Sequence, residues 1–197
     1  MMEGHTVGTS PLCAQPPDAY NHDGFYFRFS TGFGYARFSG TGPNGNVSIY
    51  DAATLGTIAL GGTIAPGLVL AGSLGAVSIT ETTLRGAPGS PGVDASQVHI
   101  AALLDWFPKP SDGWHVGATL GFGGASMKGA NADGTGATVV AGLFGGYDWW
   151  IGPQWSLGSA LWVSGTPSAA LKNSHGDNTG YNLGSGSIMF MGSLLLH

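Results

Sequence analysis

Five side chains capable of acid–base or nucleophilic chemistry recur on one face of the segments in which the chain is predicted to be extended. They are Arg28, Asp105, His115, Asp148 and Ser156. Two carboxylates, a guanidinium and an imidazole at one level attract one another strongly where the dielectric constant is low. Because unpaired buried charges are costly, we expect these residues to form a paired, structural charge cluster inside the molecule. A gate in a narrow ion path and a hydrolytic site are the alternatives.

A hydrolytic site would need a serine, a histidine and a carboxylate within hydrogen-bond reach of one another. His115, Ser156 and Asp148 have that chemistry, but their spacing matches no catalytic motif, and we expect no enzymatic activity. The other candidate residues have simpler interpretations. His99 is expected to be a lone interior histidine, and His175 and Asp177 a solvated pair in a loop. Asp133 belongs to a predicted turn, and Cys13 lies in a polar tail. The sequence predicts no metal site and no cofactor.

The elements that position these residues are predicted to be β-strands, because apolar side chains recur at every second position. In the first such segment Phe25, Phe27, Phe29, Phe33 and Tyr35 share one face, and small or polar residues occupy the other. About ten extended residues, tilted by ~45°, cross the apolar layer of a membrane. The same alternation predicts eight strands, at 24–38, 47–63, 68–84, 97–107, 114–129, 137–151, 155–167 and 181–196.

The predicted connections alternate in length along the chain. Long polar segments fall at 39–46, 85–96, 130–136 and 168–180. Short turns fall between them, at 65–67, 108–113 and 152–154. Bacterial membrane β-barrels have this alternation, with long loops outside and short turns in the periplasm. The pattern predicts an all-β fold, an eight-stranded antiparallel up-and-down transmembrane β-barrel over 23–197, with both termini periplasmic and a disordered arm over 1–22.

Aromatic residues gather where the predicted strands meet the connections. Tryptophan and tyrosine favour the membrane–water interface, where the ring is half-buried and its polar atom stays wet. Five of the six tryptophans flank the short turns and are expected to form a periplasmic aromatic girdle, at Trp106, Trp114, Trp149, Trp150 and Trp155. A sparser girdle beside the long connections is expected from Tyr35, Phe38, Tyr50 and Tyr181.

Composition supports the barrel over its alternatives. Charged residues make up 9% of the chain, against about 25% in ordinary soluble domains, and a soluble fold needs more charge on its surface. The charge-free run 52–80 is long enough for a membrane-spanning helix, but Pro66 and Gly67 interrupt it and favour two strands around a turn. The net charge of −5 argues against nucleic acid as a partner.

Together, the alternating strands, the loop asymmetry and the aromatic girdles resemble the small outer-membrane barrel superfamily that includes the transmembrane domain of OmpA, OmpX and OmpW-like proteins. The resemblance covers roughly residues 23–197 and concerns architecture, without a catalytic motif. One departure lies at the C-terminus, where the last aromatic residue is Phe190 and the chain ends on His197. Such barrels usually end on an aromatic residue that their assembly machinery recognises.

The resemblance implies a multi-pass protein of the outer membrane of a Gram-negative bacterium, from which an export signal peptide has been removed. Its expected partners are outer-membrane lipid, lipopolysaccharide and the barrel-assembly machinery, and we expect a monomer. We expect a structural or surface-interaction barrel whose lumen is filled by side chains, because an eight-stranded interior is only wide enough for side chains. A narrow porin-like channel for ions or small solutes is one alternative, and a lipid A-modifying enzyme is the other.

Overall fold

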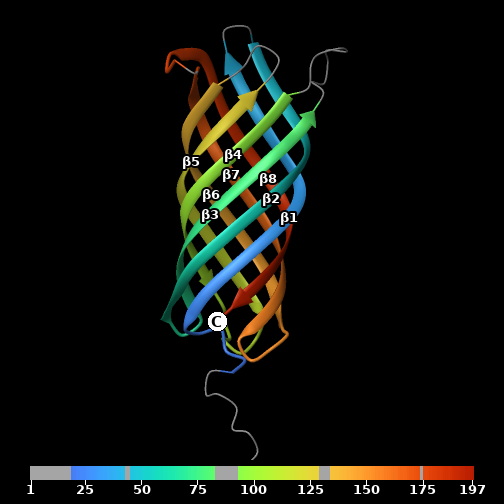
Figure 1. Ribbon diagram of the computed structural model, residues 1–197, viewed down its shortest axis with the longest axis vertical. Coiled ribbons are helices and arrows are strands. Elements are labelled where there is room, and N and C mark those ends of the chain that lie inside the picture. Colours follow the sequence, from blue (N-terminus) through green and yellow to red (C-terminus); the bar gives the residue numbers. More distant parts are fainter. Residues whose placement is uncertain (1–18, 43–44, 83–92, 129–133, 174) are drawn as a thin grey trace, which may run out of the picture.

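The computed structural model describes residues 19–42, 45–82, 93–128, 134–173 and 175–197. In these residues eight antiparallel strands form one closed barrel, in which each strand pairs with its neighbours in the chain and the last pairs with the first. Figure 1 shows the strands running obliquely around a tall barrel. The strands are β1 Phe25–Gly42, β2 Gly45–Ala65, β3 Leu68–Thr82, β4 Val93–Trp106, β5 Trp114–Lys128, β6 Gly134–Trp150, β7 Trp155–Lys172 and β8 Asn178–Leu196. This confirms the predicted all-β, up-and-down barrel.

The predicted strand bounds are accurate at one end of the barrel, and at the other end six of the eight predicted strands are too short. Beside the three short turns, which define the turn end, every observed bound lies within two residues of the predicted one. At the opposite end, the loop end, β1 continues to Gly42 and β2 begins at Gly45, so the predicted loop at 39–46 is wrong. The predicted connections at 85–96, 130–136 and 168–180 are likewise shortened by strand residues. No helix in the described part of the chain is long and apolar enough to cross a membrane.

The extra strand length at the loop end is built from polar residues that pair across strands. Ser39 and Ser48 hydrogen-bond through their hydroxyls, as do Ser96 and Ser126. Cross-strand hydroxyl pairs of this kind stabilise the outer face of the sheet, while apolar side chains such as Phe38 and Ile49 fill its inner face. A polar, Gly-rich sequence can therefore remain in a β-ladder here, which is why polarity alone misplaced the ends of the strands.

The outer face of the barrel is apolar between its two ends. Along each strand, exposed large apolar side chains alternate with buried ones, as expected for a side-chain period of two. Phe33 is 69% exposed, Phe122 72% and Leu143 67%. So large a continuous apolar surface marks contact with lipid or with another apolar partner rather than with water. The period-two pattern therefore places the predicted apolar face on the outside.

The interior is divided into an apolar half and a polar half. Near the loop end it is filled by apolar side chains that include Phe38, Ile49, Ile79, Leu171 and Leu183, all buried. Phe38, expected in an outer girdle, instead points inward and is 1% exposed. It lies an even number of residues from Arg28 on the same strand, so its side chain faces the interior as that of Arg28 does. Near the turn end the buried residues are mostly polar or charged, and the candidate site lies there.

A short segment before β1 closes the turn end. Residues 20–24, which we call the clasp, form backbone hydrogen bonds with the second and third turns and with the end of β2. Tyr20 N–H donates to Pro153 O, His22 N–H donates to Pro110 O, and Gly24 O accepts from Thr63 N–H. The side chain of Asp23 adds a bond, since its Oδ1 accepts from the Gly67 N–H at 2.9 Å. The predicted arm at 1–22 thus includes residues that pack against the barrel, while 1–18 lie outside the described residues.

Candidate functional site

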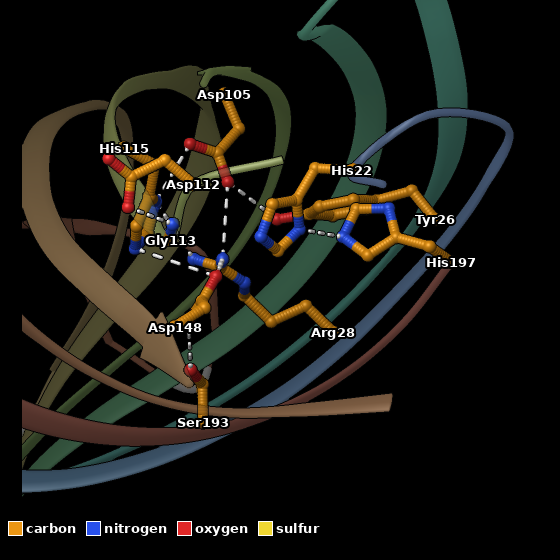
Figure 2. A network of polar contacts seen from close by, with 10 residues as sticks. All are labelled: His22, Tyr26, Arg28, Asp105, Asp112, Gly113, His115, Asp148, Ser193 and His197. Atoms are coloured by element: carbon orange, nitrogen blue, oxygen red, sulfur yellow. Dashed lines mark hydrogen bonds and ion pairs between the residues drawn. The ribbon is translucent and has the colours of Figure 1, made fainter. Parts of the chain in front are cut away.

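Arg28 of β1 lies at the centre of a buried charge cluster near the turn end. Its Nη2 donates to Asp148 Oδ2 of β6 at 2.6 Å and lies 3.4 Å from Asp105 Oδ2 of β4. All three residues are at most 4% exposed. Figure 2 shows the guanidinium between the two carboxylates. His115 of β5 joins the same group, so β1 and the consecutive strands β4, β5 and β6 each contribute one side chain to the cluster.

His115 connects the two carboxylates on the other side of Arg28. Its Nδ1 lies 2.9 Å from Asp105 Oδ1, and its Nε2 lies 3.8 Å from Asp148 Oδ2. Since an ionised carboxylate can only accept, Nδ1 carries the proton and donates to Asp105. The 3.4 Å approach of Arg28 Nη1 to the same Nδ1 is then a close contact between two donors. Arg28 and His115 therefore each contact both carboxylates of the cluster.

Two hydroxyl groups that sequence reasoning did not place in the cluster complete the coordination of the carboxylates. Tyr26 of β1 donates from its hydroxyl to Asp105 Oδ2 at 2.9 Å. Ser193 of β8 lies 3.5 Å from Asp148 Oδ1, at the limit of a hydrogen bond. Tyr26 and Ser193 both occupy alternate strand positions whose side chains are predicted to face the interior. This alternation was the signal by which the sequence could have identified them. Their specific partners depend on strand register, which parity does not give.

An aromatic column joins the charge cluster to the clasp. The rings of Trp150, His22, Phe107 and His115 stack in that order, with centroid separations of 4.3, 4.0 and 5.2 Å. His22 comes from the clasp, Phe107 directly follows β4, and Trp150 is the last residue of β6. These stacked rings fill the interior of the barrel between Arg28 and the turn end. His22 and Phe107, each 0% exposed, were both missed as site residues by the sequence analysis.

A pair of histidines from the two ends of the barrel sequence lies beside this column. His22 Nδ1 and His197 Nε2 are 2.6 Å apart, so one nitrogen donates and the other accepts. Figure 2 shows the pair next to Tyr26. Burial, the largest cause, lowers the pKa of His22 from 6.5 to about 2, helped by His197, Arg28 and His115 and opposed by Asp105. Burial likewise lowers the pKa of His197 to about 4, with Arg28 and His115 adding to the effect and Asp105 and Asp23 opposing it.

The remaining predicted interior residues are buried but lie outside the cluster contacts. Ser156 is 0% exposed, and its Oγ has no hydrogen-bond partner among the described residues. No hydrogen bond joins it to His115 in this part of the chain, so the serine–histidine–carboxylate arrangement of a hydrolase is not assembled. His99 is also buried and lies farther towards the loop end, against Trp162. Among the described residues, no group of three or more His, Cys, Asp or Glu side chains fits a metal ion.

Four of the five girdle tryptophans face outward beside the short turns. Trp106, Trp114, Trp149 and Trp155 are 49%, 63%, 52% and 39% exposed. Trp150 differs, because it has interior parity and stacks on His22. Its ring belongs to the closure of the turn end, so the expected girdle position of Trp150 is wrong. That the other four meet a membrane interface stays a prediction.

The members of the cluster are held by one another and by the aromatic rings beside them. Asp105, Asp148 and His115 are each bound to another member of the group, and the aromatic column covers them towards the turn end. Charged groups held this way stabilise one arrangement, and removing one member leaves the others buried without a partner.

Comparison with known proteins gives likeness of fold and no sequence family. No protein-family model matches the chain, and no curated protein matches it in sequence. Among solved structures it is similar to Neisserial surface protein A, with 14% identity over 87% of this chain and 96% of that one and a TM-score of 0.47. It is also similar to Ail of Yersinia pestis bound to the heparin analogue sucrose octasulfate, at 10% identity, 87% and 99% coverage and a TM-score of 0.44. OprG of Pseudomonas aeruginosa is similar at 12% identity, 91% and 100% coverage and a TM-score of 0.41.

Proposed function

We propose that this chain is a bacterial outer-membrane barrel that anchors its loop end at the cell surface and does not conduct. The observation that carries the proposal is the closed turn end, where the charge cluster, the aromatic column and the clasp fill the interior in successive layers. The exposed apolar outer face supports the membrane location. The polar strand extensions at the loop end support a role in surface contact, since they project a β-framework beyond the apolar band.

Recording from planar lipid bilayers tests this proposal. The purified wild-type barrel, folded in detergent and added to the bilayer, is expected to give no steady open state. Arg28→Ala removes the guanidinium of the cluster and leaves Asp105 and Asp148 buried without it, a change that costs about 3–5 kcal/mol when the charges are fully buried. This variant is expected to open at intervals or to unfold at a lower temperature. Lys172→Ala, on the exposed end of β7, is the matched control and should change neither property.

The narrow channel and the enzyme make different predictions for the same material. A channel would give a well-defined open state in the wild type, with ion selectivity altered by Asp105→Asn and Asp148→Asn and stability little changed. That result would overturn the closed barrel. A lipid-modifying enzyme would change the acyl pattern of lipid A in expressing cells, which mass spectrometry detects. Unchanged lipid A is expected, because Ser156 has no hydrogen bond to His115 among the described residues.

A further inference from the structure

A small chamber lies inside the barrel on the loop-end side of the charge cluster. Its polar lining comes from five strands, β1 to β5, with Arg28, Ser30, Thr57, Ser73, His99 and Thr119. Leu103, Phe144, Trp162 and Met191 complete the wall. About 30 Å³ of the chamber is open to the centre of a water molecule, and one water needs roughly 10–15 Å³ of such space. The chamber therefore has room for about two waters or for one molecule of that size.

Four polar atoms in the wall of this chamber lack hydrogen-bond partners among the described residues. They are Arg28 Nε, His99 Nδ1, Thr119 Oγ1 and Trp162 Nε1. Each of these side chains is more than nine-tenths buried, with exposed fractions from 3% to 8%. A buried polar atom without a partner costs about 1–3 kcal/mol. Four of them lining one cavity point to a bound molecule that satisfies them together.

The chemistry of the four atoms specifies the bound molecule. Arg28 Nε and Trp162 Nε1 can only donate, while the Thr119 hydroxyl and His99 Nδ1 can donate or accept. The bound molecule must therefore accept at least two hydrogen bonds. An anion gains no net attraction, because Asp105 and Asp148 already offset the charge of Arg28. A cation would meet the guanidinium of Arg28 and the indole N–H of Trp162, which can only donate.

Gly142 leaves space beside its backbone that the Trp162 indole N–H and the Thr119 hydroxyl both approach. A Cβ there would lie 2.5 Å from Trp162 Nε1 and 2.8 Å from Thr119 Oγ1, closer than real Cβ contacts. Both donors therefore crowd the same small area of backbone, where one acceptor atom can serve both. The ring of His99 lies nearby, with its centroid 5.9 Å from that of Trp162.

We propose that this chamber is a binding site for small neutral hydrogen-bond acceptors, with water as its ligand. Two waters connect Arg28 Nε with Trp162, Thr119 and His99. The charge cluster then separates a hydrated compartment from the turn end, with the guanidinium of Arg28 in contact with both. Apolar residues of the loop half cover the compartment on its other side.

Nuclear magnetic resonance of the folded barrel in detergent, with ¹⁵N-labelled tryptophan, tests the proposal. Trp162→Phe identifies the indole N–H signal of Trp162 among the six tryptophans. The wild-type Trp162 N–H is expected to show a cross-peak to long-lived water while its own exchange with D₂O is at least tenfold slower than that of exposed Trp114. Thr119→Val, which keeps the shape and removes the hydroxyl, should weaken the water cross-peak severalfold. Thr54→Val on the outer face of β2 is the matched control and should leave it unchanged.

Three results would overturn the proposal. Xenon-induced shifts of the Met191 methyl signal without a water cross-peak would mean a dry, apolar cavity. A saturable shift of the Trp162 N–H on titration with chloride would mean an anion site. An undiminished cross-peak in Thr119→Val would remove Thr119 from the site. The wild-type measurement decides the first two without any variant, and the difference in gel mobility between heated and unheated protein shows that each variant is folded.

Discussion

At the scale of single residues, the charge cluster depends on where a side chain is missing. Gly158 of β7 pairs with Asp148 of β6 across the ladder. A Cβ at position 158 would collide with the Asp148 carboxylate, which occupies the space beside the glycine and approaches Ser193 there. The ion pair between Arg28 and Asp148 is therefore made possible by a neighbouring glycine, in addition to the charges themselves.

Gly158→Ala is expected to displace the Asp148 carboxylate from Arg28 and to destabilise the barrel. The expected cost is roughly 1–3 kcal/mol, because the variant combines overpacking with a weakened buried pair. Urea unfolding in detergent, followed by tryptophan fluorescence, measures it. Gly192→Ala on β8 is the matched control, because a Cβ there meets nothing within 4 Å. Equal stability of the two variants would contradict the role given to Gly158.

The alternation of inward and outward positions along each strand correctly predicted which charged residues lie inside the barrel. It could not predict which of them contact one another. Arg28, Asp105, His115 and Asp148 were predicted to be interior from period two alone, and all are buried. Which of them touch is decided by the stagger of eight strands, a property of the closed barrel rather than of any one segment. The contribution of His22 was missed because it comes from a non-strand segment, where periodicity carries no information.

At the scale of elements, the clasp closes the barrel through its two buried histidines. His22 and His197 come from opposite ends of the barrel sequence, and their contact ties the segment before β1 to the end of β8. His197 N–H also donates to Gln154 O in the third turn. Burial, with Arg28 nearby, lowers the pKa of both imidazoles, so both are neutral at neutral pH and one donates to the other. This pair therefore makes the closure sensitive to acid.

The barrel is expected to lose stability as the pH falls from about 6.5 towards 4. Because the pKa of His22 is lowered to about 2 and that of His197 to about 4, the unfolded chain binds more protons than the folded barrel in this range. Stability is then full above pH 6.5 and falls below it, by roughly 3 kcal/mol per histidine at pH 4. Unfolding in urea at a series of pH values measures the slope.

The double variant His22→Gln, His197→Gln provides the comparison for that slope. It removes both titrating groups while other carboxylates still titrate, so its stability should depend less steeply on pH between 6.5 and 4. His175→Gln, at an exposed position near the loop end, should keep the slope of the wild type. If the double variant has the same pH dependence as the wild type, the histidine pair is not the acid-sensitive element.

At the scale of the whole molecule, the two ends of the barrel differ in what they contain. The turn end holds three short turns, the clasp and the chain end at His197, whereas the loop end extends as polar β-ladder beyond the apolar band. Closed strand pairing between β1 and β8 leaves no free edge, so the barrel satisfies its backbone internally, as a membrane interior requires. This asymmetry, visible in the sequence as alternating connection lengths, predicts one orientation in the membrane.

Site-directed thiol labelling tests that orientation. In a background with Cys13→Ser, His175→Cys lies in the connection between β7 and β8 and Gln154→Cys in the turn before β7, both exposed. With the loop end outside the cell, a membrane-impermeant maleimide should label His175→Cys on intact cells and reach Gln154→Cys only after the outer membrane is permeabilised. Position 154 being labelled on intact cells while 175 is protected would mean the opposite orientation. The closed turn end would then face the medium, and surface contact would pass from the strand extensions to the clasp.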